Sequence, residues 1–184
     1  MSLDLIIGPM FSGKTTELIR RLNTLQAIGQ KCVYINSVLD SRNTENFSTH
    51  NPVISQLGSI DSIKTNSIDI ILDKLLTYDV IGIDESQLFM GNFKLIIISI
   101  VEDHHKKVII SGLNSDFERK KFGYILDLIP ICDDITKLFP YCISCSKQHK
   151  ITKALFSKRL NNDNNKINIS YDNYIPVCRR CFLA

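Results

Sequence analysis

A short segment near the N-terminus has the residue types and spacing of a phosphate-binding loop. The pattern G-x-x-x-x-G-K-[ST] is matched by Gly8-Pro9-Met10-Phe11-Ser12-Gly13-Lys14-Thr15. Its glycines let the backbone wrap closely, so that successive N–H groups point at phosphate oxygens. Lys14 would neutralise the outer phosphates, and the Thr15 hydroxyl would bind Mg²⁺. We therefore predict that the chain binds a nucleoside triphosphate.

A second candidate site is an acidic pair that ends an apolar run. Val80–Ile83 is followed directly by Asp84 and Glu85. Phosphate-loop proteins use a carboxylate at such a strand end to hold Mg²⁺, often through water. With Asp84 occupied by the metal, Glu85 could accept a proton from a hydroxyl or a water that attacks the γ-phosphate. The pair thus favours phosphoryl-transfer chemistry.

A third candidate site consists of two CxxC pairs near the C-terminus, Cys142/Cys145 and Cys178/Cys181. The two-residue gap lets both thiolates of a pair reach one tetrahedral metal. Reducing compartments favour metal binding over disulfides. Four thiolates leave no open coordination position, so we predict a structural Zn²⁺.

Length and composition limit the remaining possibilities. A chain of 184 residues with 44% hydrophobic and 22% charged residues suits about one globular domain with a small appendage. A net charge of +3 argues against a protein whose main work is holding nucleic acid. The longest apolar run, near Leu95–Val101, is too short to span a membrane. The acidic N-terminal segment lacks the features of a secretion signal, so we expect a cytoplasmic protein.

The elements that must position these sites follow an alternating pattern. Apolar runs predict buried strands at Leu3–Ile7, Cys32–Ile35, Val80–Ile83 and Lys107–Ser111. Amphipathic spacing predicts helices at Gly13–Ile28, Ile63–Leu76 and Asn92–Asp103, although the isoleucines of the last could equally form a strand. We also expect a polar loop over Ser37–Ser59, with a short strand near Val53–Ile54.

This alternation predicts an α/β fold, in which a parallel sheet behind the phosphate loop (P-loop) is flanked by helices on both faces. The composition changes after Phe139, where the cysteine pairs bracket an asparagine-rich segment. We therefore predict a P-loop α/β domain at 1–138 and a small C-terminal zinc-binding domain at 139–184.

Beyond these derivations, the chain resembles the type II thymidine kinases, the cellular and poxvirus-type enzymes, over essentially its whole length. The resemblance rests on the P-loop and both cysteine pairs, and on four further features: Asp40-Ser41-Arg42, Asp84-Glu85-Ser86-Gln87-Leu88-Phe89, Phe117-Glu118-Arg119-Lys120-Lys121-Phe122-Gly123 and Tyr174. It implies transfer of the ATP γ-phosphate to the 5′-hydroxyl of thymidine. It also implies that the zinc anchors a "lasso" loop, which closes over the nucleoside.

The resemblance also implies roles for individual residues. Glu85 would take the 5′-hydroxyl proton, and Arg42 would stabilise the transferring phosphoryl group. Thr15, Asp84 and Asp40 would serve Mg²⁺, while Asp84 and Gln87 would join the P-loop in the ATP site. The nucleoside pocket would be lined by Met10, Phe89, Leu113, Phe117, Phe122, Ser157 and Tyr174. A homotetramer with feedback inhibition by dTTP is implied in the same way, whereas the small net charge is our reason for expecting no nucleic-acid partner.

Some positions depart from the family pattern. The glycine pair that usually precedes Tyr174 is absent from Asn168–Tyr171, and Asn114-Ser115-Asp116 precede Phe117 where the family usually has an Asp-Gly pair and a threonine. Glycines permit positive φ and close backbone approach to the sugar. We therefore expect an altered breadth of substrates and retained chemistry.

A second hypothesis from the residues is a P-loop ATPase acting on nucleic acid. Asp84-Glu85-Ser86-Gln87 would then be a DExx-type box, and the zinc pairs would contact the nucleic acid. Length counts against it, because such motors generally need a second core domain. Stimulation of ATP turnover by thymidine, or instead by single-stranded DNA, would distinguish the two hypotheses.

Overall fold

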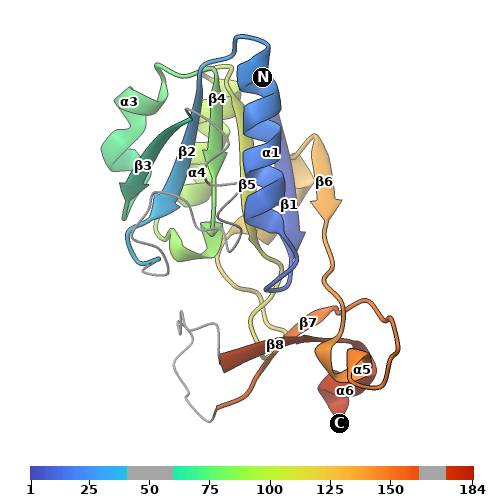
Figure 1. The fold of residues 1–184 in the computed structure, drawn as a ribbon. Helices are drawn as coiled ribbons and strands as arrows, with labels where there is room; N and C mark the ends of the chain where they lie inside the picture. Colours follow the sequence, from blue (N-terminus) through green and yellow to red (C-terminus); the bar gives the residue numbers. More distant parts are fainter. Residues whose placement is uncertain (41–59, 162–172) are drawn as a thin grey trace.

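A computed structural model describes residues 1–40, 60–161 and 173–184 (Figure 1). Its main feature is a six-stranded sheet with the order β3-β2-β4-β5-β1-β6, in which every pairing is parallel. The strands are β1 (Ser2–Gly8), β2 (Cys32–Ser37), β3 (Asp61–Thr65), β4 (Val80–Ile83), β5 (Lys107–Leu113) and β6 (Asp134–Lys137). The carboxyl ends of parallel strands meet at one edge of the sheet, so the loops after β1, β2, β4 and β5 are brought together there.

Helices cover both faces of the sheet, which confirms the predicted α/β layers. Alternate residues of each strand point to opposite faces. Ile6 of β1 packs with Leu18 and Leu22 of α1 (Lys14–Ala27) in one core cluster. Leu5 of β1 packs in a larger cluster on the other face. The helical elements that pack against the strands in this larger cluster include α3 (Leu72–Leu75), α4 (Phe93–Glu102) and the 3₁₀ segment η3 (Ile125–Ile131).

One predicted helix is wrong in its first part. Helical spacing over Ile63–Leu76 predicts one continuous helix, but β3 occupies Asp61–Thr65, and helical turns begin only with η1 (Asp69–Ile71), directly before α3. The apolar spacing comes from residues 68–75. β3 is a sheet-edge strand whose partner, β2, is distant in sequence. The Asn92–Asp103 segment forms the helix α4, which resolves the helix-or-strand ambiguity.

The C-terminal part contains a two-stranded antiparallel sheet of β7 (Phe156–Arg159) and β8 (Tyr174–Val177). Two short helices accompany it, α5 (Ile143–Ser146) and α6 (Arg179–Leu183). Figure 1 shows this part below the carboxyl edge of the main sheet. The predicted strand near Val53–Ile54 lies outside the described residues.

Within residues 1–40, 60–161 and 173–184, no helix is long and apolar enough to cross a bilayer.

Candidate active site

The predicted P-loop connects β1 to α1 at the carboxyl edge of the sheet. Gly8 is required by space, because a Cβ there would lie 2.5 Å from the carbonyl oxygen of Leu138. Gly13 is required by conformation, because its φ is 81°, in the left-handed region that glycine tolerates best. The Lys14 ammonium is buried and donates a hydrogen bond of 2.9 Å to the carbonyl oxygen of Pro9. The loop is thus curled around its own lysine.

This loop has the features of an anion site. α1 begins directly after Gly13, so the positive end of a 14-residue helix faces the loop. The Ser12 hydroxyl oxygen is buried and has no hydrogen-bond partner among the described residues. A phosphate oxygen bound in the loop would satisfy such a donor.

Asp84 lies at the end of β4 and is completely buried. Its Oδ2 accepts hydrogen bonds from the Thr15 hydroxyl at 2.7 Å and the Tyr34 hydroxyl at 2.8 Å. Its Oδ1 accepts from the Glu85 backbone N–H at 2.9 Å and from the Ser111 hydroxyl. The predicted Mg²⁺ residues Thr15 and Asp84 are therefore in direct contact.

The electrostatics of Asp84 suit a cation. Burial raises the pKa of its carboxyl group, and the charge of neighbouring Glu85 raises it further, although the three hydroxyl donors act in the opposite direction. A divalent cation beside the Thr15 oxygen would favour the ionised carboxylate. The hard oxygen donors of these two residues fit Mg²⁺, which prefers a few protein oxygens, phosphate oxygens and water.

Glu85 has a strained backbone conformation and directly follows Asp84, the candidate Mg²⁺ ligand. Its φ of 47° lies in the left-handed region, and its side chain is largely buried. The amide nitrogen of Gln87 donates to the Glu85 carboxylate, while its oxygen accepts from the Leu113 N–H at 3.0 Å. Both ends of the Gln87 amide are thus used within the protein. Strained backbone conformations such as that of Glu85 cluster at functional sites. The further contact between Gln87 and ATP stays a prediction.

The Asp40 and Arg42 predictions differ in what the structure describes. Asp40 follows β2, the neighbour of β4, and is buried. Its carboxylate accepts a hydrogen bond of 3.1 Å from the side chain of Asn36. Arg42 lies outside the described residues, as do the family departures at Asn168–Tyr171, so their roles stay predictions.

The structure brings several predicted nucleoside-site residues together. The Met10 N–H in the P-loop donates to the Ser157 hydroxyl at 3.0 Å, which joins β7 to the phosphate site. Arg159 stacks over the Phe117 ring, 3.7 Å from its centre, and its Nε donates to the Tyr174 hydroxyl at 3.0 Å.

The remaining predicted pocket residues have different surroundings. Phe89 is buried in the main core, where its ring stacks on Phe93 with centres 5.9 Å apart. Leu113 ends β5, and Phe122 lies half-buried in the loop that follows. That these three side chains contact the nucleoside stays a prediction.

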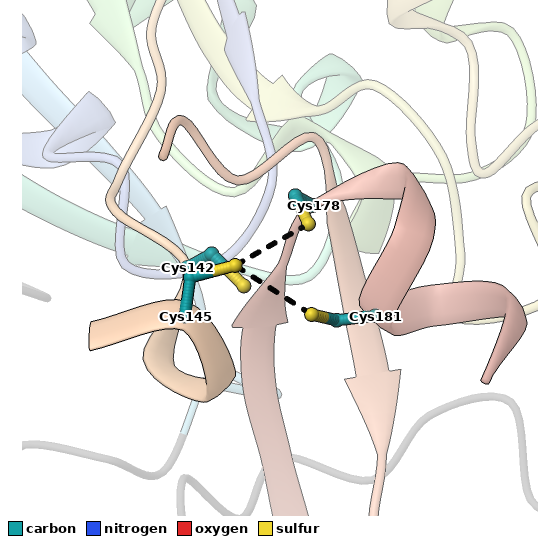
Figure 2. A group of neighbouring side chains, drawn as sticks. All are labelled: Cys142, Cys145, Cys178 and Cys181. Atoms are coloured by element: carbon teal, nitrogen blue, oxygen red, sulfur yellow. Dashed lines mark hydrogen bonds between the residues drawn. The ribbon is translucent and has the colours of Figure 1, made fainter. Parts of the chain in front are cut away.

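The four cysteines form one cluster (Figure 2). All four Sγ atoms lie within 4.8 Å of one another. Cys145 Sγ is 3.8 Å from Cys178 Sγ and 3.7 Å from Cys181 Sγ. Tetrahedral Zn²⁺ with Zn–S bonds of about 2.3 Å separates its sulfurs by about 3.8 Å. The cluster therefore fits zinc in both donor type and spacing.

The thiols of the cluster differ in acidity. Burial opposes ionisation of Cys142, but hydrogen bonds from the backbone of Cys178 and Cys145 outweigh it, so the pKa is lowered to about 7. Hydrogen bonding to Cys178 raises the pKa of Cys181 to about 12. Metal binding must therefore displace protons from the cluster, which makes zinc affinity depend on pH.

Sequence reasoning missed Tyr34, Ser111 and Arg159. Each of the predicted strands Cys32–Ile35 and Lys107–Ser111 contains one side-chain hydroxyl, that of Tyr34 in the first and that of Ser111 in the second. Both hydroxyls donate to Asp84. A hydroxyl in an otherwise apolar strand near its carboxyl end was the available signal. No sequence signal separated Arg159, which is half-buried, from the other basic residues of the chain.

The parallel sheet and the loop between β1 and α1 define the chain as a P-loop nucleotide-binding protein of the α/β class. The family model for thymidine kinase matches residues 1–182. A thymidine kinase of Amsacta moorei entomopoxvirus is 42% identical, with 99% of this chain and 98% of that protein covered. Those of Choristoneura fumiferana entomopoxvirus and vaccinia virus (strain Ankara) are 39% and 36% identical, each over 99% of this chain and over 96% and 97% of their own lengths. The chain therefore belongs to the thymidine kinase family, which confirms the resemblance and makes it a kinase.

Proposed function

We propose that this protein transfers the γ-phosphate of ATP to the 5′-hydroxyl of thymidine, giving dTMP and ADP. The observation that carries the proposal is the position of Glu85, a largely buried residue next to Asp84, whose carboxylate contacts Thr15 of the P-loop, in a chain of this family. A base next to a triphosphate site fits transfer to a hydroxyl.

In the proposed reaction, the 5′-oxygen of thymidine forms a bond to the γ-phosphorus while the bond from that phosphorus to the β,γ-bridging oxygen breaks. Glu85 accepts the hydroxyl proton, and ADP leaves. Lys14 and the backbone N–H groups of the P-loop hold the phosphates. Thr15 and Asp84 would hold Mg²⁺, with Asp40 nearby, and the metal would neutralise charge on the phosphate oxygens. Arg42 would stabilise the charge that spreads over the transferred group.

Gln87 supports the role of Glu85 in this scheme. Its amide donates to the carboxylate and, at the same time, holds the backbone at the last residue of β5. The hydrogen bond thereby fixes the orientation of the Glu85 carboxylate. A base that is held in one orientation contributes to phosphoryl transfer through positioning.

We further propose that thymidine lies between the P-loop and the β7–β8 hairpin. The Met10–Ser157 hydrogen bond and the Phe117–Arg159–Tyr174 contacts support this location. A pocket of this kind, with polar groups aimed at the base edge, would reject purines by size and distinguish cytosine by its donor pattern.

The C-terminal part is proposed to be a lasso domain at 139–184, anchored by Zn²⁺ on the four cysteines, beside a P-loop domain at 1–138. Free thiols at these positions suit a reducing, cytoplasmic setting. A homotetramer that is inhibited by dTTP completes the proposal on the basis of the family, and the net charge of +3 supports the absence of a nucleic-acid partner.

The test follows γ-labelled ATP in the presence of Mg²⁺ and either thymidine or 5′-deoxythymidine, which lacks the acceptor hydroxyl. We expect the label in dTMP, in equal amount to the ADP formed, and no transfer to 5′-deoxythymidine. Label that appears as inorganic phosphate with both nucleosides would refute the proposed reaction.

A further inference from the structure

The loop after β5 contains a tight turn that is held by a buried carboxylate. Asp116 is 5% exposed, and its Oδ1 accepts from the backbone N–H groups of Glu118 at 2.9 Å and Lys120 at 2.8 Å. Its own N–H donates to the Lys120 carbonyl at 2.9 Å. Arg119 has a φ of 66°, which residues other than glycine rarely adopt. The turn is therefore a defined unit that fixes the directions of the side chains it carries.

One of these side chains reaches two aromatic rings that pack against the four-cysteine cluster. The Arg119 guanidinium carbon lies 4.8 Å from the centre of the Phe182 ring and 5.9 Å from that of Phe156. The two rings pack on each other with centres 5.1 Å apart, and both pack against the buried cysteines. Phe182 follows Cys181 directly, and its N–H donates to the Cys178 carbonyl at 2.9 Å. Arg119 thus rests on an aromatic pair attached to the proposed zinc ligands.

The same turn contacts the other end of the hairpin. Phe117 lies under Arg159, the last residue of β7, and Arg159 in turn donates to the hydroxyl of Tyr174, the first residue of β8. Between these contacts, Ser157 accepts from the P-loop N–H of Met10. The turn therefore holds β7 at both of its ends, and the P-loop holds it in between.

We propose that Arg119 is a positioning residue for nucleoside binding. By stacking on Phe156 and Phe182, it fixes the hairpin that carries Ser157 and Tyr174 in register with the P-loop. The inference rests on the proposed function, because that proposal places these two side chains at thymidine. Loss of the stacking would leave the phosphate site intact and weaken the nucleoside site.

The test compares Arg119→Met with Arg179→Met. Methionine keeps a Cβ and an unbranched chain, so the strained backbone of residue 119 is unchanged while the cation is lost. Arg179 is a matched control, since its guanidinium carbon also lies over the Phe156 ring, at 5.1 Å, but from α6 within the same C-terminal part. Arg119→Met should raise the KM for thymidine about three- to tenfold. The kcat, the KM for ATP and the zinc content should stay unchanged, Arg119→Lys should recover part of the loss, and Arg179→Met should match the wild type.

A second measurement is independent of the substrate. Amide hydrogen exchange of β7 and β8, without nucleoside, should be faster in Arg119→Met and unchanged in Arg179→Met. Phe182→Leu removes the ring that lies nearer to Arg119 and should reproduce the Arg119→Met result. It replaces Arg119→Met in the test if that variant does not fold. Equal effects of the two arginine variants, a lower kcat at unchanged KM, or unchanged exchange in Arg119→Met would overturn the inference. Faster exchange in Arg119→Met alone, with a wild type that does not phosphorylate thymidine, would support the positioning role and refute the proposed function.

Discussion

Gln87 joins the proposed base to the end of β5, and the variant Gln87→Met tests this connection. Methionine has a similar length but lacks both polar ends of the amide. The substitution removes the hydrogen bond to the Glu85 carboxylate and the one from the Leu113 N–H at 3.0 Å. The first loss should affect turnover, and the second should affect stability.

The two magnitudes follow from the bonds that are lost. A hydrogen bond to a charged group contributes about 1.5–3 kcal/mol, and about 1.4 kcal/mol corresponds to tenfold in rate. If the Glu85 contact acts on the transition state, kcat should fall roughly 10- to 100-fold. An unpaired buried N–H costs about 1–3 kcal/mol, and each kcal/mol lowers Tm by roughly 2–4 °C in a chain of this size. We therefore expect Tm to fall by about 2–12 °C.

The assay is steady-state formation of dTMP at saturating Mg·ATP and thymidine, together with thermal melting. Gln148→Met is the control, because Gln148 is exposed in the C-terminal part, and it should change neither quantity. In a Glu85→Gln background, Gln87→Met should lower kcat no further, because Gln87 acts through Glu85. A kcat within twofold of the wild type, or full additivity in the double variant, would refute the reasoning.

Three further predictions concern the base, the zinc cluster and the start of α1. Glu85→Gln should retain ATP binding and lower turnover roughly 10²–10⁴-fold, and near-native turnover would exclude Glu85 as the base. Cys145→Ser should lose zinc and weaken thymidine binding before the protein unfolds, and unchanged zinc content together with unchanged affinity would refute the cluster. Glu17→Gln should lower Tm at pH 7, because a hydrogen bond from Arg20 holds the pKa of Glu17 at about 2 in place of 4.5. That stabilisation is present above pH 4.5 and lost as the pH falls toward 2, so the melting curves of the variant and the wild type should converge over this range, and a difference independent of pH would contradict the assignment.

The interior of the sheet could be predicted from sequence, whereas its edges could not. Val80–Ile83 forms β4 with the predicted bounds, because a strand buried on both faces is a continuous apolar run. The edge strand β6, at Asp134–Lys137, is mostly exposed and polar, and it forms through pairing with β1, which is far away in the sequence. Periodicity carries no information about such a pairing.

The candidate site shows the same division. The P-loop and the cysteine pairs could be found from sequence because their residues are neighbours in the chain, so their spacing encodes the geometry. Tyr34 and Ser111 reach Asp84 from two different strands, and Arg159 of β7 meets Phe117 of the loop that follows β5. These contacts depend on strand order and tertiary packing, and local pattern does not specify either.

The most direct test of the central claim is product analysis with Mg·ATP and a panel of acceptors: thymidine, deoxyuridine, deoxycytidine, deoxyguanosine and single-stranded DNA. Glu85→Gln is run beside the wild type. Our account predicts that thymidine is converted to dTMP, that DNA does not accelerate ATP turnover, and that dTMP formation collapses in the variant. If no nucleoside is phosphorylated and DNA alone accelerates ATP hydrolysis, the account is contradicted, and the four-cysteine cluster would have to be examined as a nucleic-acid contact.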